Sequence, residues 1–146
     1  MKYLGLDLGS RRLGISISDI TGTIATSYKV IEHNEEYDRL LTEIGKIIEE
    51  ENIKKIVLGF PKNMNNTIGP KGQLSLEFKE KLEEMYKIDV YLQDERLSTK
   101  EAENMLIKNN TRRNKRKKVI DKLAATIILQ SFLDKEKRLW RIINLH

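Results

Sequence analysis

The chain has 146 residues, of which 34% are charged and 39% hydrophobic, with a net charge of +5 and no cysteine. This length suits one domain with a substantial core, which we take to span residues 1–146, and the lack of cysteine excludes disulfides, zinc–thiolate sites and thiol nucleophiles. No segment resembles a signal peptide or approaches the ~20 apolar residues of a membrane span, so we expect a cytoplasmic protein without a membrane partner.

The first thirty residues alternate apolar and polar side chains, which is typical of strands. Leu4, Leu6 and Leu8 alternate within residues 2–8, and a second alternation covers residues 13–18. Residues 23–30 follow as a third strand. Because the turns between these segments are short, the pattern predicts a three-strand antiparallel meander.

Helices and buried strands then alternate along the chain. We expect helices at residues 37–48 and 74–85, with a buried strand at 53–60, a loop at 61–72 and a fifth strand at 88–93. Ser98-Thr99-Lys100-Glu101 matches a capping box that opens a third helix, and a last helix runs from Val119 to Leu133. Residues 134–146 form a C-terminal extension that continues this helix or leaves it. The order predicts an α/β fold, in which the meander and two βα crossovers build a five-stranded mixed sheet with helices on both faces.

Three carboxylates stand in unusual positions. Asp7 interrupts the first apolar strand, Glu95 follows the fifth strand, and Asp121 lies at the start of the last helix. A carboxylate in such a strand is costly to bury unless it is paired or binds a metal, and strand ends of this kind meet at one edge of a sheet. We therefore expect an oxygen cage for Mg²⁺ or Mn²⁺. The alternatives are a solvent-facing Asp7 on an edge strand and an Asp121 that caps its helix.

The positive charge is concentrated in one stretch. Residues 112–122 carry seven basic residues against one acidic residue, so the rest of the chain is close to neutral. Such a block is usually a solvated loop, but beside a carboxylate cage it favours a phosphate-binding rim. The candidate nucleic-acid contacts are Arg12, Lys71, Arg96, Arg112, Arg113, Lys115, Arg116, Lys117 and Lys118.

These residues together predict metal-dependent hydrolysis of phosphodiester bonds. Carboxylates around divalent cations support this reaction without a histidine base or a covalent nucleophile. The chain lacks good candidates for either role, since Ser10 and Ser98 have no base partner and we interpret them as a turn residue and a helix cap. We interpret His33 as a loop residue and His146 as a chain end, not as zinc ligands.

Four segments in order resemble the motifs of the YqgF/RuvX family. They are Gly5–Gly14 continuing to Asp19, Gly59-Phe-Pro61 with Gly69–Gly72, Asp94–Thr99, and Lys118–Ala125. The resemblance implies a ribonuclease H-like fold, with Asp7, Glu95 and Asp121 as metal-binding catalytic carboxylates. It also implies a nuclease that matures the 5′ end of pre-16S ribosomal RNA, or a Holliday junction resolvase, and we favour the first. The chain departs from the family pattern at Asn65-Asn66, where the central loop usually has an acidic residue and a glycine.

Several alternatives remain open at the level of sequence. The substrate is a ribosomal RNA precursor or branched DNA, and the protein is a monomer or a homodimer, the latter being required for symmetric cutting of two strands. A binding module without catalysis is disfavoured because all three carboxylates are present. The nucleotide-binding folds of sugar kinases and Hsp70-type ATPases also open with Asp-x-Gly, but they need two such domains and this chain supplies one.

Overall fold

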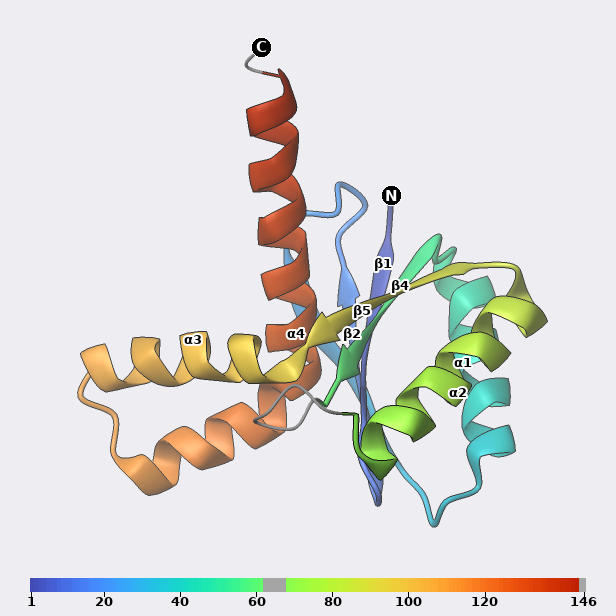
Figure 1. Cartoon of the computed structure of the whole chain (residues 1–146), viewed down its shortest axis with the longest axis horizontal. Coiled ribbons are helices and arrows are strands. Elements are labelled where there is room, and N and C mark those ends of the chain that lie inside the picture. The colour runs from blue at the N-terminus through green and yellow to red at the C-terminus, as the bar shows by residue number, and fades with distance from the viewer. Residues whose placement is uncertain (62–67, 145–146) are drawn as a thin grey trace.

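The computed structural model describes residues 1–61 and 68–144, except for the side chains of residues 97–99, 101, 102, 106, 117, 118, 121 and 122. Five strands and four helices follow one another in the predicted order (Figure 1). They are β1 (Tyr3–Leu8), β2 (Arg12–Ser18), β3 (Ala25–Glu32), α1 (Tyr37–Glu51), β4 (Lys55–Phe60), α2 (Pro70–Tyr86), β5 (Asp89–Asp94), α3 (Glu95–Lys108) and α4 (Arg113–Asn144).

The strands form one mixed sheet in the order β3-β2-β1-β4-β5. β1 pairs antiparallel with β2, which pairs antiparallel with β3, while β1, β4 and β5 run parallel. The predicted meander and two crossovers are therefore confirmed. As a consequence, the carboxyl ends of β1, β4 and β5 meet at a single edge of the sheet.

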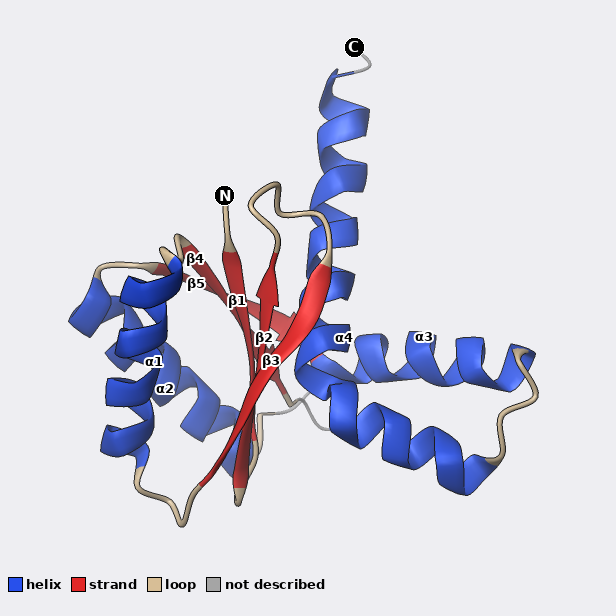
Figure 2. Cartoon of the chain, turned by 180° about the vertical axis from the view of Figure 1, so that it is seen from behind, coloured by secondary structure: helices blue, strands red, loops and turns tan. Residues whose placement is uncertain are grey.

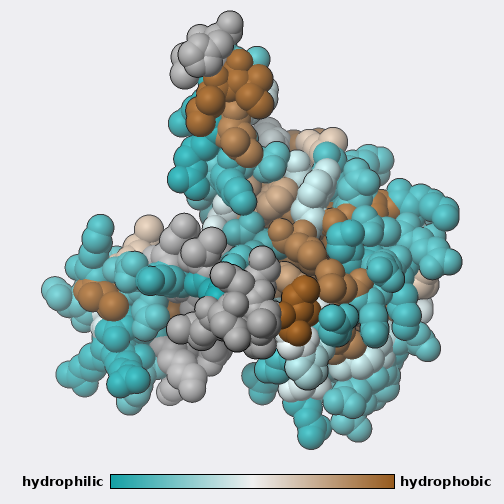
Figure 3. Space-filling view, viewed as in Figure 1, coloured by the Kyte–Doolittle hydropathy of each residue, from teal (hydrophilic) through white to brown (hydrophobic). Residues whose placement is uncertain are grey.

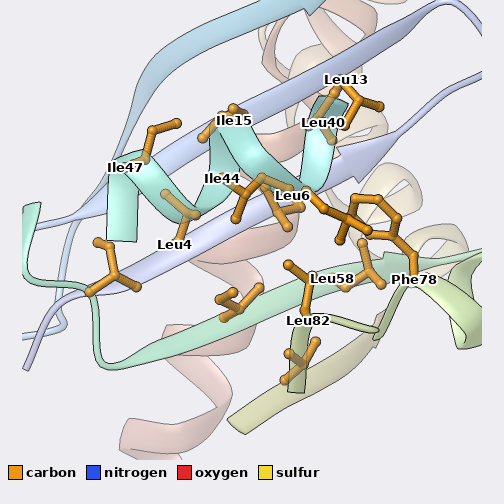
Figure 4. Packing of buried hydrophobic residues seen from close by; sticks show 14 of the residues in the cluster. Leu4, Leu6, Leu13, Ile15, Leu40, Ile44, Ile47, Leu58, Phe78 and Leu82 are labelled. Carbon is orange, nitrogen blue, oxygen red and sulfur yellow. The ribbon is translucent and has the colours of Figure 1, made fainter. Parts of the chain in front are cut away.

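Helices cover both faces of the sheet, as predicted (Figure 2). On one face, α1 and α2 pack against Leu4 and Leu6 of β1, and Ile44 and Phe78 belong to the same buried cluster (Figure 4). On the other face, Val57 of β4 packs with the apolar side of α4. Because side chains alternate along a strand, the residues of β1 that lie between the leucines, Asp7 among them, face α4.

Several predicted boundaries are wrong. α3 begins at Glu95 instead of Ser98, because the Asp94 side chain accepts a hydrogen bond from the backbone N–H of Arg96 at 3.0 Å and so caps the helix four residues earlier. α2 begins at Pro70, inside the predicted loop, and proline suits a first helical position. β3 is displaced by two residues towards the C-terminus.

The basic stretch is also helical, which the sequence pattern did not predict. α4 begins at Arg113, so Asp121 lies inside the helix and is not its cap. Lysine and arginine are good helix formers, and the turn before the helix is closed by Arg116, whose Nη1 donates to the Thr111 carbonyl at 2.7 Å. The helix continues through the C-terminal extension to Asn144.

α3 and the first part of α4 leave the sheet together as a helical hairpin (Figures 1 and 2). We call this hairpin, residues 95–120, the α3–α4 arm. At the other end of α4, Leu139, Trp140 and Ile143 are exposed and form an apolar surface on the projecting helix (Figure 3). Within the described part of the chain, no helix combines the length and the apolar character needed to span a bilayer.

Candidate active site

Two of the three predicted carboxylates lie together at the edge where the parallel strands end. Asp7 is the penultimate residue of β1, and Glu95 directly follows β5 as the first residue of α3. Between them lies the end of β4, which pairs with both strands. The carboxyl group of Glu95 is hydrogen-bonded to that of Asp7. The structure thus joins two acidic side chains that are distant in sequence.

Gly59 provides the space for the Glu95 side chain. A Cβ at this position would lie 2.6 Å from Glu95 Oε1 and 2.7 Å from Ile128 Cδ1, closer than real contacts allow. Any other residue at 59 would therefore displace the side chain of Glu95 and that of Ile128 from α4. The sequence placed Gly59 only at the end of a strand, because the requirement comes from residues far along the chain.

A buried hydroxyl anchors α4 next to this pair. Ser16 of β2 is fully buried, and its Oγ donates to the Ala125 carbonyl of α4 at 2.7 Å. Gly5 permits this approach, since a Cβ there would lie 2.8 Å from Leu129 Cβ and 3.0 Å from the Ala125 carbonyl oxygen. The helix is therefore held close to the sheet on the face that carries Asp7.

The electrostatics of the pair follow from its burial. The pKa of Glu95 is raised from 4.5 to about 8, first by burial and then by the hydrogen bond to Asp7 and the charge of Asp7, while Lys71 acts in the opposite direction. Near neutral pH the Glu95 carboxyl therefore keeps its proton and donates it to Asp7. A cation that binds at these carboxyl groups would therefore displace the proton of Glu95.

A cleft of about 340 Å³ opens from the pair. One wall comes from the turn after β1 and the start of α1, and another from the start of α2, where Lys71 lies. Its lining residues include Asp7, Gly9, Glu35, Tyr37, Lys71 and Glu95. The cleft is therefore lined by the cationic residue Lys71 and by the carboxyl-bearing residues Asp7, Glu35 and Glu95.

The third predicted carboxylate lies outside the described side chains. Asp121 belongs to α4, but its side chain is not described, and the same holds for Lys117 and Lys118. Among the described residues, no group of three or more acidic or histidine side chains is arranged to hold a metal ion. The described part of the site thus consists of Asp7 and Glu95.

The predicted phosphate contacts lie in two different regions. Lys71 lines the cleft, whereas Arg112, Arg113 and Lys115 are exposed at the tip of the α3–α4 arm. Arg12 is exposed at the start of β2. Two guanidinium groups already have partners inside the chain: Arg96 forms an ion pair with Asp94 at 3.1 Å, and Arg116 binds the Thr111 carbonyl.

His33 lies beside the cleft, although the sequence indicated no role for it in the site. His33, interpreted from the sequence as a loop residue, does lie between β3 and α1, but it is buried, and its Nε2 lies 2.8 Å from the Gly9 carbonyl oxygen. Glu35 and Tyr37 of the cleft wall follow it directly. Only the position of His33 after a strand hinted at this, because its partner is 24 residues away.

Comparison with known proteins identifies the family. The model of the RuvX family, described as Holliday junction resolvase, matches residues 1–135. A relative from Bacillus subtilis, provisionally named a pre-16S rRNA nuclease, is 51% identical over 135 residues, which cover 92% of this chain and 98% of the relative. The chain therefore belongs to the RuvX family, and it is a nuclease by family.

Solved structures support the fold. RuvC of Thermus thermophilus aligns with a TM-score of 0.53 at 15% identity, over 70% of this chain and 68% of RuvC. This similarity confirms the ribonuclease H-like fold. A ROK hexokinase from the same organism aligns with a TM-score of 0.50 at 23% identity, but over only 38% of the hexokinase. The chain therefore shares its fold with part of the hexokinase.

Proposed function

We propose that this RuvX-family nuclease hydrolyses phosphodiester bonds of RNA and processes the 5′ end of pre-16S ribosomal RNA in the cytoplasm. The observation that carries the proposal is that Asp7 and Glu95, which are adjacent, both line a cleft together with Lys71. RNA is favoured as the substrate because the highly similar relatives are provisionally named for it. The similarity to RuvC, at 15% identity, concerns the fold alone.

The donor set of the pair fits a hard divalent cation. It consists of carboxyl oxygens only, which suits Mg²⁺ or Mn²⁺ and not softer metals. We assign Asp7, Glu95 and Asp121 as the metal-holding and catalytic carboxylates. A divalent cation bound there would supply a water of lowered pKa and stabilise the charge on the leaving oxygen. The protein's own contribution is to hold the carboxylates in place and to bind the phosphate.

The path of α4 supports the assignment of Asp121. The helix runs antiparallel to β1, with Phe132 beside Tyr3 and Ala125 over Gly5. A Cβ on Gly14, the residue of β2 paired with Asp7, would lie 3.5 Å from Ala125 Cβ. Residue 121 precedes Ala125 by about one helical turn. The next turn of α4 therefore continues in the direction of Asp7.

Basic residues at two distances from the cleft would hold the substrate. We assign phosphate contacts to Lys71 in the cleft, to Arg12 at the start of β2, the strand that pairs with β1, and to the exposed residues of the α3–α4 arm. Arg96 and Arg116 remain in the proposed set, although each also has an internal partner. The complete set is Arg12, Lys71, Arg96, Arg112, Arg113, Lys115, Arg116, Lys117 and Lys118.

Branched DNA is the second candidate substrate, because the family model is described as Holliday junction resolvase. A parallel assay separates the two. Labelled single-stranded RNA carrying a 16S precursor end and a four-way DNA junction are incubated with Mg²⁺ or Mn²⁺, with Asp7→Asn as the blank. We expect metal-dependent cutting of the RNA that is lost at least ~100-fold in the variant. Full activity of Asp7→Asn would refute the assignment, and symmetric cutting of the junction alone would favour the resolvase.

Binding without cleavage tests the arm. Arg112, Arg113 and Lys115 are replaced together by alanine, and the control replaces three exposed lysines elsewhere, Lys54, Lys81 and Lys29. Each lost phosphate contact lowers the dependence of log K on log salt by about 0.7 for a single strand, so we expect a decrease of about 2 in the arm variant. An equal decrease in the control would show that only overall charge matters.

A further inference from the structure

His33 connects the turn that follows Asp7 with the wall of the cleft. Its backbone N–H donates to the Arg11 carbonyl at 2.9 Å, and both nitrogens of its ring form hydrogen bonds with backbone groups. Nε2 lies 2.8 Å from the Gly9 carbonyl oxygen, and Nδ1 accepts the backbone N–H of Glu35 at 3.0 Å. The side chain is buried and lies against the ring of Tyr37, with the centroids 5.8 Å apart.

These partners define the state of the imidazole. An N–H faces Nδ1, so Nδ1 is the acceptor and carries no proton. A carbonyl oxygen faces Nε2, so Nε2 carries the proton and donates it. The ring is therefore neutral in its Nε2–H form, and each nitrogen has one backbone partner.

The turn that His33 holds is the one next to the reacting group. Gly9 follows Asp7 by two residues, and its N–H donates to the Arg12 carbonyl at 2.9 Å. A Cβ on Gly9 would lie 2.9 Å from that same carbonyl oxygen, so the turn is tight. With His33 on its carbonyl, Gly9 is held through both of its backbone polar groups.

The other partner of His33 is a strained residue. Glu35 has a φ of +66°, in the left-handed region that a glutamate rarely adopts. Such a conformation persists only where neighbouring bonds fix it. Here the bond from the Glu35 N–H to His33 and the bond from the Tyr37 N–H to the Glu35 carbonyl at 3.0 Å do so. Gly9, Glu35 and Tyr37 all line the cleft.

We propose that His33 is a positioning residue of this nuclease. Its neutral imidazole fixes the Gly9 turn, and with it Asp7, against the Glu35 wall of the cleft. The inference rests on the proposed function, because it assigns a role in the same reaction. A displacement of a reacting group by about 1 Å is enough to lower a rate about 100-fold, so a clamp two residues from Asp7 is well placed to matter.

Variants can separate the two bonds. His33→Gln keeps a donor at the place of Nε2, and His33→Asn keeps an acceptor at the place of Nδ1, while His33→Phe keeps neither. If the hydrogen bond from His33 to the Gly9 carbonyl positions Asp7, kcat falls about 10- to 100-fold in His33→Asn and His33→Phe. His33→Gln should keep most of the wild-type kcat. We expect kcat to change much more than the KM for RNA in all three, because Arg12 is the one proposed phosphate contact that belongs to this turn.

The control is Asn34→Ala in the same loop. Within the described part of the chain, the exposed Asn34 side chain accepts only a long bond from Arg11, at 3.4 Å, so its loss leaves the His33 contacts intact. Its kcat should equal that of the wild type. Equal kcat in His33→Gln and His33→Asn would overturn the proposal, and so would a loss of kcat that simply follows the loss of Tm across the variants.

A measurement that does not depend on nuclease activity separates the test of His33 from the test of the proposed function. The imidazole ¹⁵N shifts of the wild-type protein report the tautomer, and we expect a proton on Nε2 and none on Nδ1. The opposite tautomer would overturn the clamp even in an active nuclease. A wild-type protein with the expected tautomer that cuts neither RNA nor DNA would refute the proposed function, and the positioning role with it.

Discussion

Replacing Glu95 by Gln keeps the shape of the side chain and its ability to donate to Asp7, but it removes the titration. The wild-type carboxyl has its pKa raised from 4.5 to about 8 by burial and by Asp7. Between pH 4.5 and about pH 8, Glu95 is protonated in the folded protein but ionised in the unfolded chain. The free energy of unfolding of the wild type therefore falls as the pH rises from about 4.5 to about 8, and Glu95→Gln lacks this fall.

The size of the effect follows from the displacement of the pKa. At about 1.4 kcal/mol for each pH unit, the full displacement would correspond to about 5 kcal/mol. Glu95 is half-buried, and the screening that its solvent contact provides lowers this to about 2 kcal/mol. Relative to the wild type, we therefore expect Glu95→Gln to gain about 2 kcal/mol of stability between pH 5 and pH 8.5 in the absence of metal.

Urea unfolding in EDTA at about pH 5, 7 and 8.5 measures this gain. Glu103→Gln is the matched control, since Glu103 is exposed on the same helix, and its difference from the wild type should not change with pH. Added Mn²⁺ should raise the Tm of the wild type, more at higher pH because binding releases the proton, and should raise that of Glu95→Gln much less. Parallel pH profiles for the wild type and Glu95→Gln would refute the reasoning about the raised pKa of Glu95.

Further predictions concern the packing around the pair. Gly59→Ala places a Cβ 2.6 Å from Glu95 Oε1 and should cost about 1–3 kcal/mol of stability together with most of the activity; in Gly14→Ala the nearest contact is an ordinary 3.5 Å, and the variant should stay close to the wild type in both assays. Ser16→Ala removes the side-chain hydrogen bond to the Ala125 carbonyl, which keeps its partner within α4, and should cost about 0.5–1.5 kcal/mol in urea unfolding. If Ser16→Ala loses less stability than a variant in which an exposed serine is replaced by alanine, Ser16 does not anchor the helix.

Local patterns in the sequence determined the framework of this protein. The alternation of leucines in β1 and β2, the helical spacing in α1 and the short turns follow from contacts with near neighbours, and they predicted the element order and the mixed sheet. That topology in turn places the ends of β1 and β5 at one edge, so Asp7 and Glu95 were recognisable as candidates. The sequence did not predict the helix cap at Asp94, because serine and threonine further along offered an equally good local capping pattern.

Tertiary structure alone decided how the site is built. Gly59 is required because Glu95 and Ile128 converge on it, and Ser16 matters because it reaches a carbonyl 109 residues away. His33 acts on Gly9 across 24 residues. The raised pKa of Glu95 likewise arises only when folding buries it beside a second carboxyl. Each of these properties depends on distances between segments that the chain brings together only when it folds, and no local pattern in the sequence records such distances.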